Sequence, residues 1–297
     1  MQLTIAQFDY VIYYLALYAA KDGLAKAGLE LELVSTGNDD SAVEAVCSKR
    51  ADVALCDPSM AALAMQGGKP CSVIGQLAHK APMYLITLNQ LYEPAKPAHL
   101  AHILRNSRLS TYPKPSTTYA CTCSFLKRIG LEPGKDVELL QTPFRDELGP
   151  LFSAESEFAI VNEPICTQAA ANGAKVLRAL SEDFGSMTFS GLTIRKGFGK
   201  KPAEHRSLSL LMKGIRQGMQ TIHKDQKAAL AAARSAFPEI ADEHLKKSIA
   251  GLVKQDILVR TPSIPRADWD ALAKLRLESG ELKSAKFAEV LDMRYAR

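Results

Sequence analysis

Short apolar runs alternate with helical stretches along the first two thirds of the chain. Apolar runs that are bounded by Gly, Pro, Asn or Asp predict strands. The predicted strands are the N-terminal segment 1–8, Leu31–Val34, Val53–Cys56, Val73–Leu77, Val137–Leu140, Phe158–Val161 and Val176–Leu180. Strands that alternate with helices favour parallel sheets with helical crossovers. The pattern therefore predicts an α/β protein.

The pattern repeats within the chain at a constant offset of 106 residues (164 − 58), which aligns Pro58 with Pro164 and Gly67 with Gly173. The segments from GLELELVSTGNDD to GGK and from GKDVELLQTPFRD to GAK match without a gap. Each contains a strand, a loop, a helix, a second strand, an acid–proline step and a second helix. We interpret the repeat as two α/β units of the same design.

An acid–proline step follows a buried strand in each repeat: Asp57-Pro58 in the first and Glu163-Pro164 in the second. In open parallel sheets, ligands bind at the carboxyl ends of the strands. We therefore expect both steps at such ends, with each unit contributing one edge to a shared cleft.

The remaining segments predict how the units are connected. Met83–Asn89 leaves the first unit and Ser190–Lys196 follows the second, so two extended strands are expected to cross between the units. From about Lys201 the pattern is helical, which predicts a tail packed on the first unit. The expected domains are a discontinuous first lobe of 1–87 plus 191–297, and a second lobe of 88–190.

Composition and charge narrow the class of protein. With 47% hydrophobic and 23% charged residues, the chain has the composition of a soluble globular protein. Its net charge of +5 is spread out, and no basic stripe or reading module predicts nucleic-acid binding. The longest apolar run, Val11–Ala20, is too short to cross a bilayer. We expect a monomer with no membrane span and no nucleic-acid partner.

The N-terminal residues MQLTIAQF lack the basic start of a signal peptide. We therefore expect a cytoplasmic protein if Met1 is the native start, or an exported one if a leader has been removed. The cysteines lie mostly in apolar segments, where a free thiol packs as a small hydrophobe, and six unpaired thiols fit a reducing compartment. They are Cys47, Cys56, Cys71, Cys121, Cys123 and Cys166. Their spacing predicts no metal site.

Over nearly its whole length, the chain resembles a known family. The segments that carry the resemblance include GLELELVSTG, ADVALCDPS, STTYACTCSFLKRIGLEPGKDVELL, VNEP and LESGELKSAKFAEVLDMRYAR. They resemble the substrate-binding proteins of ABC importers for nitrate, sulfonates, taurine and pyrimidine precursors of thiamine. The resemblance implies the type II periplasmic-binding-protein fold, capture of a small molecule between closing lobes, a periplasmic location, and a permease and ATPase as partners.

The candidate ligand residues of the first unit follow its predicted strands. Tyr10 can stack on a planar ligand, or it can be a buried packing residue. Gly37 permits close approach, while Asn38 and Asp39 can cap the next helix. Asp57 can also cap a helix, because proline is favoured at the first helical position, and capping does not exclude ligand contact. The candidates are Asp9, Tyr10, Gly37, Asn38, Asp39, Asp57 and Ser59.

In the second unit, Ser116 is expected to cap a helix whose free N–H groups could hold an anionic or polar group. Glutamate caps poorly, which favours a ligand role for Glu163. The resemblance implies that the Ser-Thr-Thr segment and the glutamate of the EP pair contact the ligand. The candidates are Ser116, Thr117, Thr118, Asn162 and Glu163.

The charge of the candidates indicates the chemistry of the ligand. Four acids contrast with three nearby cations, whereas a bare anion such as nitrate prefers cationic partners. The acids are Asp9, Asp39, Asp57 and Glu163, and the cations are Lys80, Lys114 and Arg145. Our hypothesis is a ligand with N–H donors: an aminopyrimidine, another nitrogenous ring or an amine-bearing sulfonate. Helix-start amides can also bind an anion without side-chain charge. No cofactor or metal is expected.

Enzymes and sensors on related folds are alternatives. A thiamine-pyrimidine synthase of this group needs a catalytic histidine and a cysteine-rich iron-binding run, but EDFGSMTFSGLTIRKG contains neither residue type. Desulfinases use a cysteine nucleophile, for which Cys56 is the candidate. The pair His99-x-x-His102 is expected on the surface. A LysR-type effector protein would carry a winged helix-turn-helix before the first strand. We expect a binding protein without catalytic residues.

Overall fold

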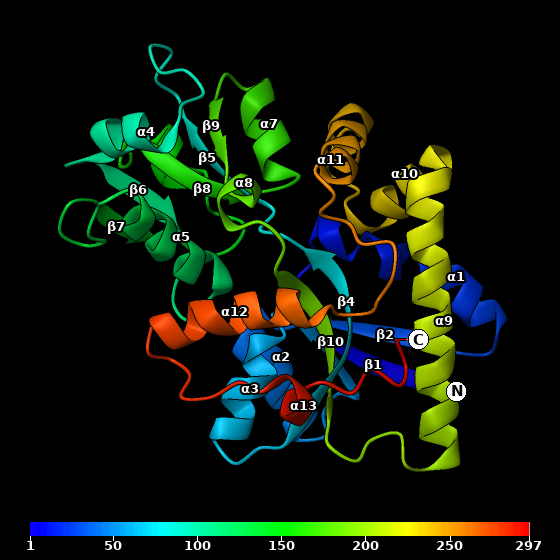
Figure 1. Ribbon diagram of the computed structural model, residues 1–297. Helices are drawn as coiled ribbons and strands as arrows, with labels where there is room; N and C mark the ends of the chain where they lie inside the picture. The colour runs from blue at the N-terminus through cyan, green and yellow to red at the C-terminus, as the bar shows by residue number, and fades with distance from the viewer. Residues whose placement is uncertain (297) are drawn as a thin grey trace. The chain divides into compact units, whose positions relative to one another are not determined.

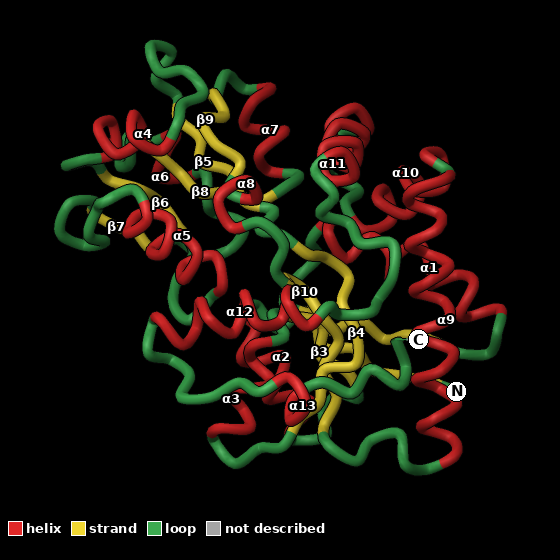
Figure 2. Tube along the Cα trace, in the orientation of Figure 1, coloured by secondary structure: helices red, strands yellow, loops and turns green. Residues whose placement is uncertain are grey.

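A computed structural model describes residues 1–296 as two α/β units (Figure 1). Unit 1 contains Met1–Lys80 and the described residues from Ser186 onward, and unit 2 contains Ala81–Gly185. The chain therefore passes from one unit to the other twice. Each unit has its own five-stranded sheet, drawn in yellow in Figure 2.

The sheet of unit 1 has the strand order β2-β1-β3-β10-β4. β1 pairs in parallel with β2 and β3, whereas β10 lies antiparallel between β3 and β4. Every residue of β3 is buried, as expected for a central strand covered on both faces. The strands are β1 (Gln2–Gln7), β2 (Glu30–Ser35), β3 (Val53–Cys56), β4 (Cys71–His79) and β10 (Thr188–Arg195).

Two groups of helices belong to this sheet. α2 (Asp39–Cys47) and α3 (Ser59–Gln66) share a buried apolar cluster with Trp269 of α12 (Arg266–Glu278). The others are η1 (Ile12–Tyr14), α1 (Leu15–Lys26), α9 (Pro202–Lys224), α10 (Gln226–Ala236), α11 (Asp242–Lys254) and α13 (Phe287–Val290). The long helix α9, yellow in Figure 1, packs closely on α1. The helical tail thus belongs to unit 1, as the sequence predicted.

The sheet of unit 2 has the order β7-β6-β8-β5-β9. β6 pairs in parallel with β7 and β8, and β5 lies antiparallel between β8 and β9. The strands are β5 (Met83–Thr87), β6 (Arg108–Thr111), β7 (Glu138–Gln141), β8 (Phe158–Asn162) and β9 (Lys175–Ala179). The helices are α4 (Pro97–Leu104), α5 (Thr117–Arg128), α6 (Gly149–Phe152), α7 (Ile165–Ala171) and α8 (Ser181–Phe184).

The two sheets have the same design, which confirms the repeat read from the sequence. β3 and β8 are the central strands, and each is followed by an acid–proline step and a helix. The sheets are mixed rather than purely parallel, because each contains one antiparallel strand next to its central strand. This strand is β10 beside β3 in unit 1 and β5 beside β8 in unit 2.

The unit boundaries differ from those expected from the sequence. A boundary after residue 87 would assign β5 to the first unit, but β5 is hydrogen-bonded between β8 and β9. Similarly, a second lobe that ends at residue 190 would include Thr188 and Ser190, but these residues pair with β4 in unit 1. Neither β5 nor β10 crosses between units, since the chain changes unit before each strand begins. An extended apolar pattern identifies a strand but does not identify the sheet that it joins.

Candidate functional site

Asp57 lies at the carboxyl end of β3, and its carboxylate holds the first turn of α3. Its Oδ1 accepts a hydrogen bond from the Ser59 N–H at 2.7 Å, and its Oδ2 accepts one from the Ser59 hydroxyl at 2.8 Å. The same Oδ2 accepts from the Arg276 guanidinium at 2.7 Å. Asp57 and Ser59 are both buried. The N-cap of α3 is Pro58 rather than Asp57, so the carboxylate bonds to the first helical residue from one position further back than expected. Its contact with a ligand remains a prediction.

Arg276 is a buried cation on α12 that sequence analysis did not identify. Its side chain is 0% exposed, and it also donates to Glu281 Oε2 at 2.7 Å and to Ser59 Oγ at 3.1 Å. Burial lowers the pKa of Arg276, but the Asp57 and Glu281 carboxylates raise it further, so the net shift is upward. This ion pair fixes the C-terminal tail against the end of β3. No sequence pattern links two residues that lie 219 positions apart.

The loop after β2 places the start of α2 beside Asp57. Gly37 has a φ of +78°, which glycine adopts readily, and its N–H donates to the Phe8 carbonyl at 2.9 Å. Asn38 caps α2, because its side chain accepts from the Ser41 N–H at 2.7 Å. Asp39 is half-buried and accepts from the Asp57 N–H at 3.0 Å.

The carboxyl of Asp39 is harder to ionise than an ordinary aspartate. Burial is the main cause, and the neighbouring Asp57 carboxylate adds to it, so that the pKa of Asp39 rises to about 7. The Asp57 N–H and the more distant Arg276 guanidinium oppose this shift. The structure therefore joins Asp39 and Asp57 at one edge of the unit 1 sheet, as expected from the order of the strands.

Asp9 and Tyr10, which follow β1, contact the same edge of the unit. Asp9 Oδ1 accepts from the Tyr10 N–H at 2.7 Å and from the Ser35 hydroxyl at 3.3 Å. The ring of Tyr10 stacks on Tyr18, with 5.7 Å between the ring centroids. Tyr10 thus has the packing contact that was one of its two predicted roles, and stacking on a ligand remains a prediction.

Three further polar groups lie near this edge, and sequence analysis missed them. Gln7 ends β1, while Thr188 and Ser190 begin β10, which runs antiparallel to β3 and so starts where β3 ends. All three residues are at most 1% exposed. Gln7 Oε1, Thr188 Oγ1 and Ser190 Oγ have no hydrogen-bond partner among residues 1–296. Buried polar atoms are normally hydrogen-bonded to protein or to ordered water, so each of these atoms can accept a bond from a water molecule or a ligand.

In unit 2, Ser116 caps α5 as predicted, because its hydroxyl accepts from the Tyr119 N–H at 3.1 Å. Thr117 and Thr118 follow in the first turn, and both are buried. The Thr118 carbonyl accepts from the Thr122 hydroxyl at 2.8 Å. The three candidates therefore form the start of one helix directly after the β6 edge.

Glu163 follows β8 and bonds to the first turn of α7. Its Oε2 accepts from the Thr167 N–H at 3.1 Å, and its Oε1 accepts from the Thr167 hydroxyl at 3.0 Å. Although glutamate is a poor cap by preference, this longer side chain reaches the helix from the position before Pro164. Asn162 differs, since it is 2% exposed and its Oδ1 has no partner among the described residues.

Glu147 is a second acid in unit 2 that sequence analysis missed. It lies between β7 and α6 with only 2% exposure, and its Oε1 accepts from the Tyr112 hydroxyl at 2.9 Å. Its Oε2 has no partner among residues 1–296, and burial raises the pKa of the carboxyl. Tyr112 directly follows β6, so this pair lies on the strand-end side of the sheet. The repeat does not indicate a buried acid at this position, because Glu147 aligns with Ser41 in the first unit.

A comparison of the sequence with family models identifies the chain. The model described as NMT1/THI5 like matches residues 8–229, which is more than half of the sequence. The chain belongs to the NMT1/THI5-like family. No curated protein matches this family member in sequence.

Solved structures similar to this family member match it over nearly its full length. The ligand-binding component of an ABC-type import system from Staphylococcus aureus, solved with zinc bound, has a TM-score of 0.80 at 14% identity and covers 100% of this chain and 98% of its own. The alkanesulfonate-binding protein SsuA from Xanthomonas axonopodis pv. citri, bound to MOPS, has a TM-score of 0.77 at 13% identity and covers 98% of both chains.

The periplasmic nitrate-binding protein NrtA from Synechocystis PCC 6803 has a TM-score of 0.76 at 12% identity, covering 99% of this chain and 86% of its own. These likenesses, together with the two mixed sheets, confirm the type II periplasmic-binding-protein fold predicted from the sequence. Within residues 1–296, no helix has the length and apolar character needed to cross a membrane.

The candidate nucleophile Cys56 is poorly suited to that role in this family member. Its side chain is fully buried at the end of β3. Burial raises the pKa of Cys56 well above its usual value, and the Asp39 and Asp57 carboxylates raise it further. A reactive cysteine needs an environment that lowers the thiol pKa. Across residues 1–296, no three His, Cys, Asp or Glu side chains are grouped to hold a metal ion.

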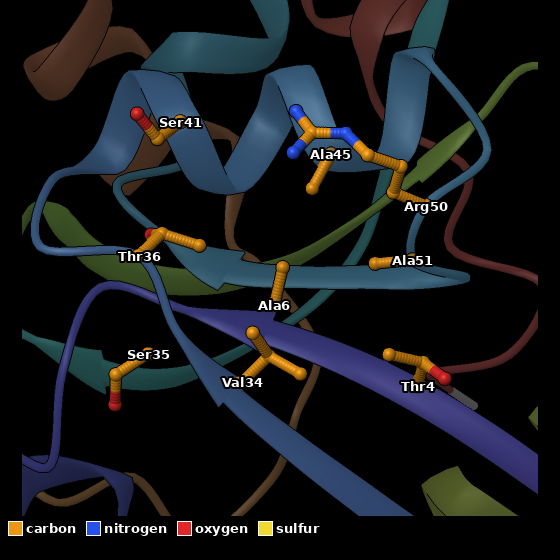
Figure 3. A pocket seen from close by; sticks show the side chains of 9 residues that line it. All are labelled: Thr4, Ala6, Val34, Ser35, Thr36, Ser41, Ala45, Arg50 and Ala51. Atoms are coloured by element: carbon orange, nitrogen blue, oxygen red, sulfur yellow. The ribbon is translucent and has the colours of Figure 1, made fainter.

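A separate pocket of about 340 Å³ lies in unit 1 between α2 and the strands β1 and β2 (Figure 3). One of its lining residues is Arg50, whose Nε donates to the Ser48 hydroxyl at 3.1 Å. The lining residues are Thr4, Ala6, Val34, Ser35, Thr36, Ser41, Ala45, Arg50 and Ala51. None of the predicted ligand residues lines this pocket, which runs along the sheet beneath α2.

Proposed function

We propose that this NMT1/THI5-like protein is a substrate-binding protein that captures a small polar solute for an ABC-type importer. The similar structures that support this role include a ligand-binding component of an ABC-type import system and binding proteins for alkanesulfonate and nitrate. If the protein is exported, its partners are a membrane permease and an ATPase, and its location is the periplasm.

The class of solute follows from unsatisfied acceptors at the strand ends. Gln7 Oε1 in unit 1 and Glu147 Oε2 and Asn162 Oδ1 in unit 2 are buried oxygens without a partner in the described chain. A carboxylate or amide oxygen accepts hydrogen bonds, so these atoms favour a solute that donates N–H or O–H groups. We propose an aminopyrimidine, another nitrogenous ring or an amine-bearing sulfonate rather than a bare anion.

The buried cation of unit 1 supports the same choice. Arg276 would be a natural partner for nitrate or a sulfonate, but Asp57 and Glu281 already occupy its guanidinium. An anion that recruited Arg276 would have to break a buried ion pair. The two unpartnered hydroxyls of β10 can either donate or accept, so they can serve a mixed donor–acceptor ring.

We further propose that one solute contacts the strand ends of both units, which close on it by a hinge motion. The repeat supports this mode because it gives each unit an acid–proline step after its central strand. The two passages of the chain between units would act as the hinge. The candidate contacts for this mode are Asp9, Tyr10, Gly37, Asn38, Asp39, Asp57, Ser59, Ser116, Thr117, Thr118, Asn162 and Glu163.

A thermal-shift panel with a 4-aminopyrimidine, taurine, methanesulfonate and nitrate tests the proposal. A ligand that binds only the folded state adds about 2.7 kcal/mol of stability at one hundred times its dissociation constant. We expect the aminopyrimidine, or taurine through its amine, to raise Tm. A rise with nitrate and methanesulfonate alone would contradict the proposed solute class, and turnover of any compound would contradict the binding role.

The variant Glu147→Gln sharpens this test. The new side chain keeps an oxygen for the Tyr112 hydroxyl but replaces the unpartnered acceptor with an N–H₂ donor. We expect affinity for the N–H donor solute to fall at least about tenfold, the effect of roughly 1.4 kcal/mol. Glu155→Gln, an exposed change in the same unit, serves as the control and should leave affinity unchanged.

A further inference from the structure

Two cysteine sulfur atoms touch in unit 1. Cys47 is the last residue of α2 and Cys71 is the first residue of β4, and their Sγ atoms are 3.4 Å apart. Both are free thiols. Cys71 is fully buried, whereas Cys47 is partly exposed. One cysteine of the pair is therefore partly accessible to solvent, and the other is buried in contact with it.

A second contact holds the same two segments together. Glu44 lies one turn before Cys47 on α2, and Lys69 lies two residues before Cys71. The Glu44 carboxylate pairs with the Lys69 ammonium at 2.5 Å. Both cysteines also belong to the apolar cluster that joins α2 to the sheet. The end of α2 and the start of β4 are thus positioned by contacts that do not depend on the thiols. A bond between the sulfurs requires them to approach from 3.4 Å to about 2.05 Å.

We propose that Cys47 and Cys71 form a reversible disulfide bond when the protein meets a disulfide oxidant such as oxidised glutathione. The Cys47 thiol loses its proton and attacks one sulfur of the oxidant, forming a mixed disulfide and releasing one glutathione thiolate. Cys71 then loses its proton and attacks the Cys47 sulfur, which releases the second thiolate. Two cysteine thiols are oxidised, and one oxidant disulfide is reduced to two thiols.

The two cysteines have different roles in this exchange. Burial and the contact with Cys47 raise the pKa of Cys71 to about 12, which disfavours Cys71 as the first attacking thiol. Its access is also poor. Cys47 is therefore the entry point, and Cys71 completes the bond because it is already in contact with the sulfur that carries the leaving group.

The bond would make the stability of unit 1 depend on its redox surroundings. It would close a loop between two residues 24 positions apart and restrict the unfolded chain. It would also fix the end of α2, the helix whose start carries Asn38 and Asp39. In a reducing compartment the thiols stay free, and in an oxidising one the bond forms. This inference does not depend on the proposed solute.

The test is to incubate the folded full-length protein with oxidised glutathione and then to count free thiols. We expect the count to fall from six to four, and to return to six with dithiothreitol. Alkylation and peptide mass spectrometry should recover one cross-linked pair that contains Cys47 and Cys71. A glutathione adduct that persists on Cys47, or a cross-link between other cysteines, would overturn the proposal.

Two variants separate this bond from general oxidation. Cys47→Ser should abolish the cross-link, while Cys123→Ser, which removes a partly exposed thiol that contacts Tyr119 in unit 2, should leave it intact. Oxidation should raise Tm for the wild type and for Cys123→Ser but not for Cys47→Ser. An equal rise in all three proteins would contradict the assignment. Peptide mapping of the wild type decides the question even if a variant does not fold.

Discussion

Replacing Arg276 with Met tests the ion pair that joins the C-terminal tail to the end of β3. Methionine fills much of the volume of the arginine stem but removes the hydrogen bonds to Asp57, Glu281 and Ser59. The Asp57 side chain is only 2% exposed, so its carboxylate would be left buried without a counter-charge. Breaking a buried pair by removing one partner typically costs about 3–5 kcal/mol.

The expected loss for Arg276→Met is therefore about 3–5 kcal/mol of unfolding free energy in unit 1. Glu281 contributes less to this figure, because its side chain is 31% exposed and remains solvated. Adding Asp57→Asn to Arg276→Met should recover at least about 1 kcal/mol, since the neutral amide no longer requires a cation. Asp57→Asn also keeps an oxygen that can accept from the Ser59 N–H.

Urea unfolding followed by tryptophan fluorescence is the assay. The chain has one tryptophan, Trp269, which is fully buried on the same helix as Arg276 and so reports on unit 1. Lys274→Met is the control, because Lys274 is exposed and its pair with Glu278 should contribute less than about 1 kcal/mol. A loss below about 1 kcal/mol for Arg276→Met, or an equal loss for the control, would contradict a stabilising role for the buried ion pair.

Two further predictions concern packing and pH. Gly218→Ala should destabilise unit 1 by at least about 2 kcal/mol in the same assay, because the added Cβ would lie 2.0 Å from the Ala16 carbonyl oxygen. The control Gly251→Ala should be neutral or slightly stabilising, because the nearest atom to its added Cβ is 4.0 Å away. Similar losses for the two variants would contradict the predicted clash. The raised pKa of Asp39 means that the folded state binds more protons than the unfolded state between about pH 4 and pH 7, so stability should fall as pH rises through that window. Asp39→Asn should remove this fall in stability, so that the variant is more stable than the wild type at pH 8 by on the order of 1 kcal/mol and equally stable near pH 4. Thermal melts at several pH values measure the difference. A larger benefit of the variant at pH 4 than at pH 8 would contradict the upward shift of the Asp39 pKa.

The sequence predicted the elements and the repeat well because both depend on local patterns. Strand–helix alternation located β3 and β8, and the aligned proline and glycine positions showed that the two units share one design. The pattern failed at β5 and β10. An antiparallel strand that joins a sheet from elsewhere in the chain has the same apolar character as its neighbours, so its partner sheet cannot be read from sequence alone.

The candidate site was only partly predictable for a related reason. Asn38 and Ser116 cap their helices as expected, because capping acts over a few residues. The partner of Asp57 was missed, since Arg276 approaches it only through tertiary packing. Glu147 and Gln7 were missed because nothing local distinguishes a buried acceptor without a partner from a surface one.

Isothermal titration of the wild-type protein with an aminopyrimidine, and separately with nitrate, is the decisive measurement of the proposed binding role and solute class. We expect one aminopyrimidine to bind per chain, with no chemical change in the compound recovered afterwards, and nitrate to give no comparable heat. Saturable binding of nitrate with none of the aminopyrimidine would contradict the proposed solute class. Recovery of a converted product would contradict the claim that the protein binds its solute without transforming it.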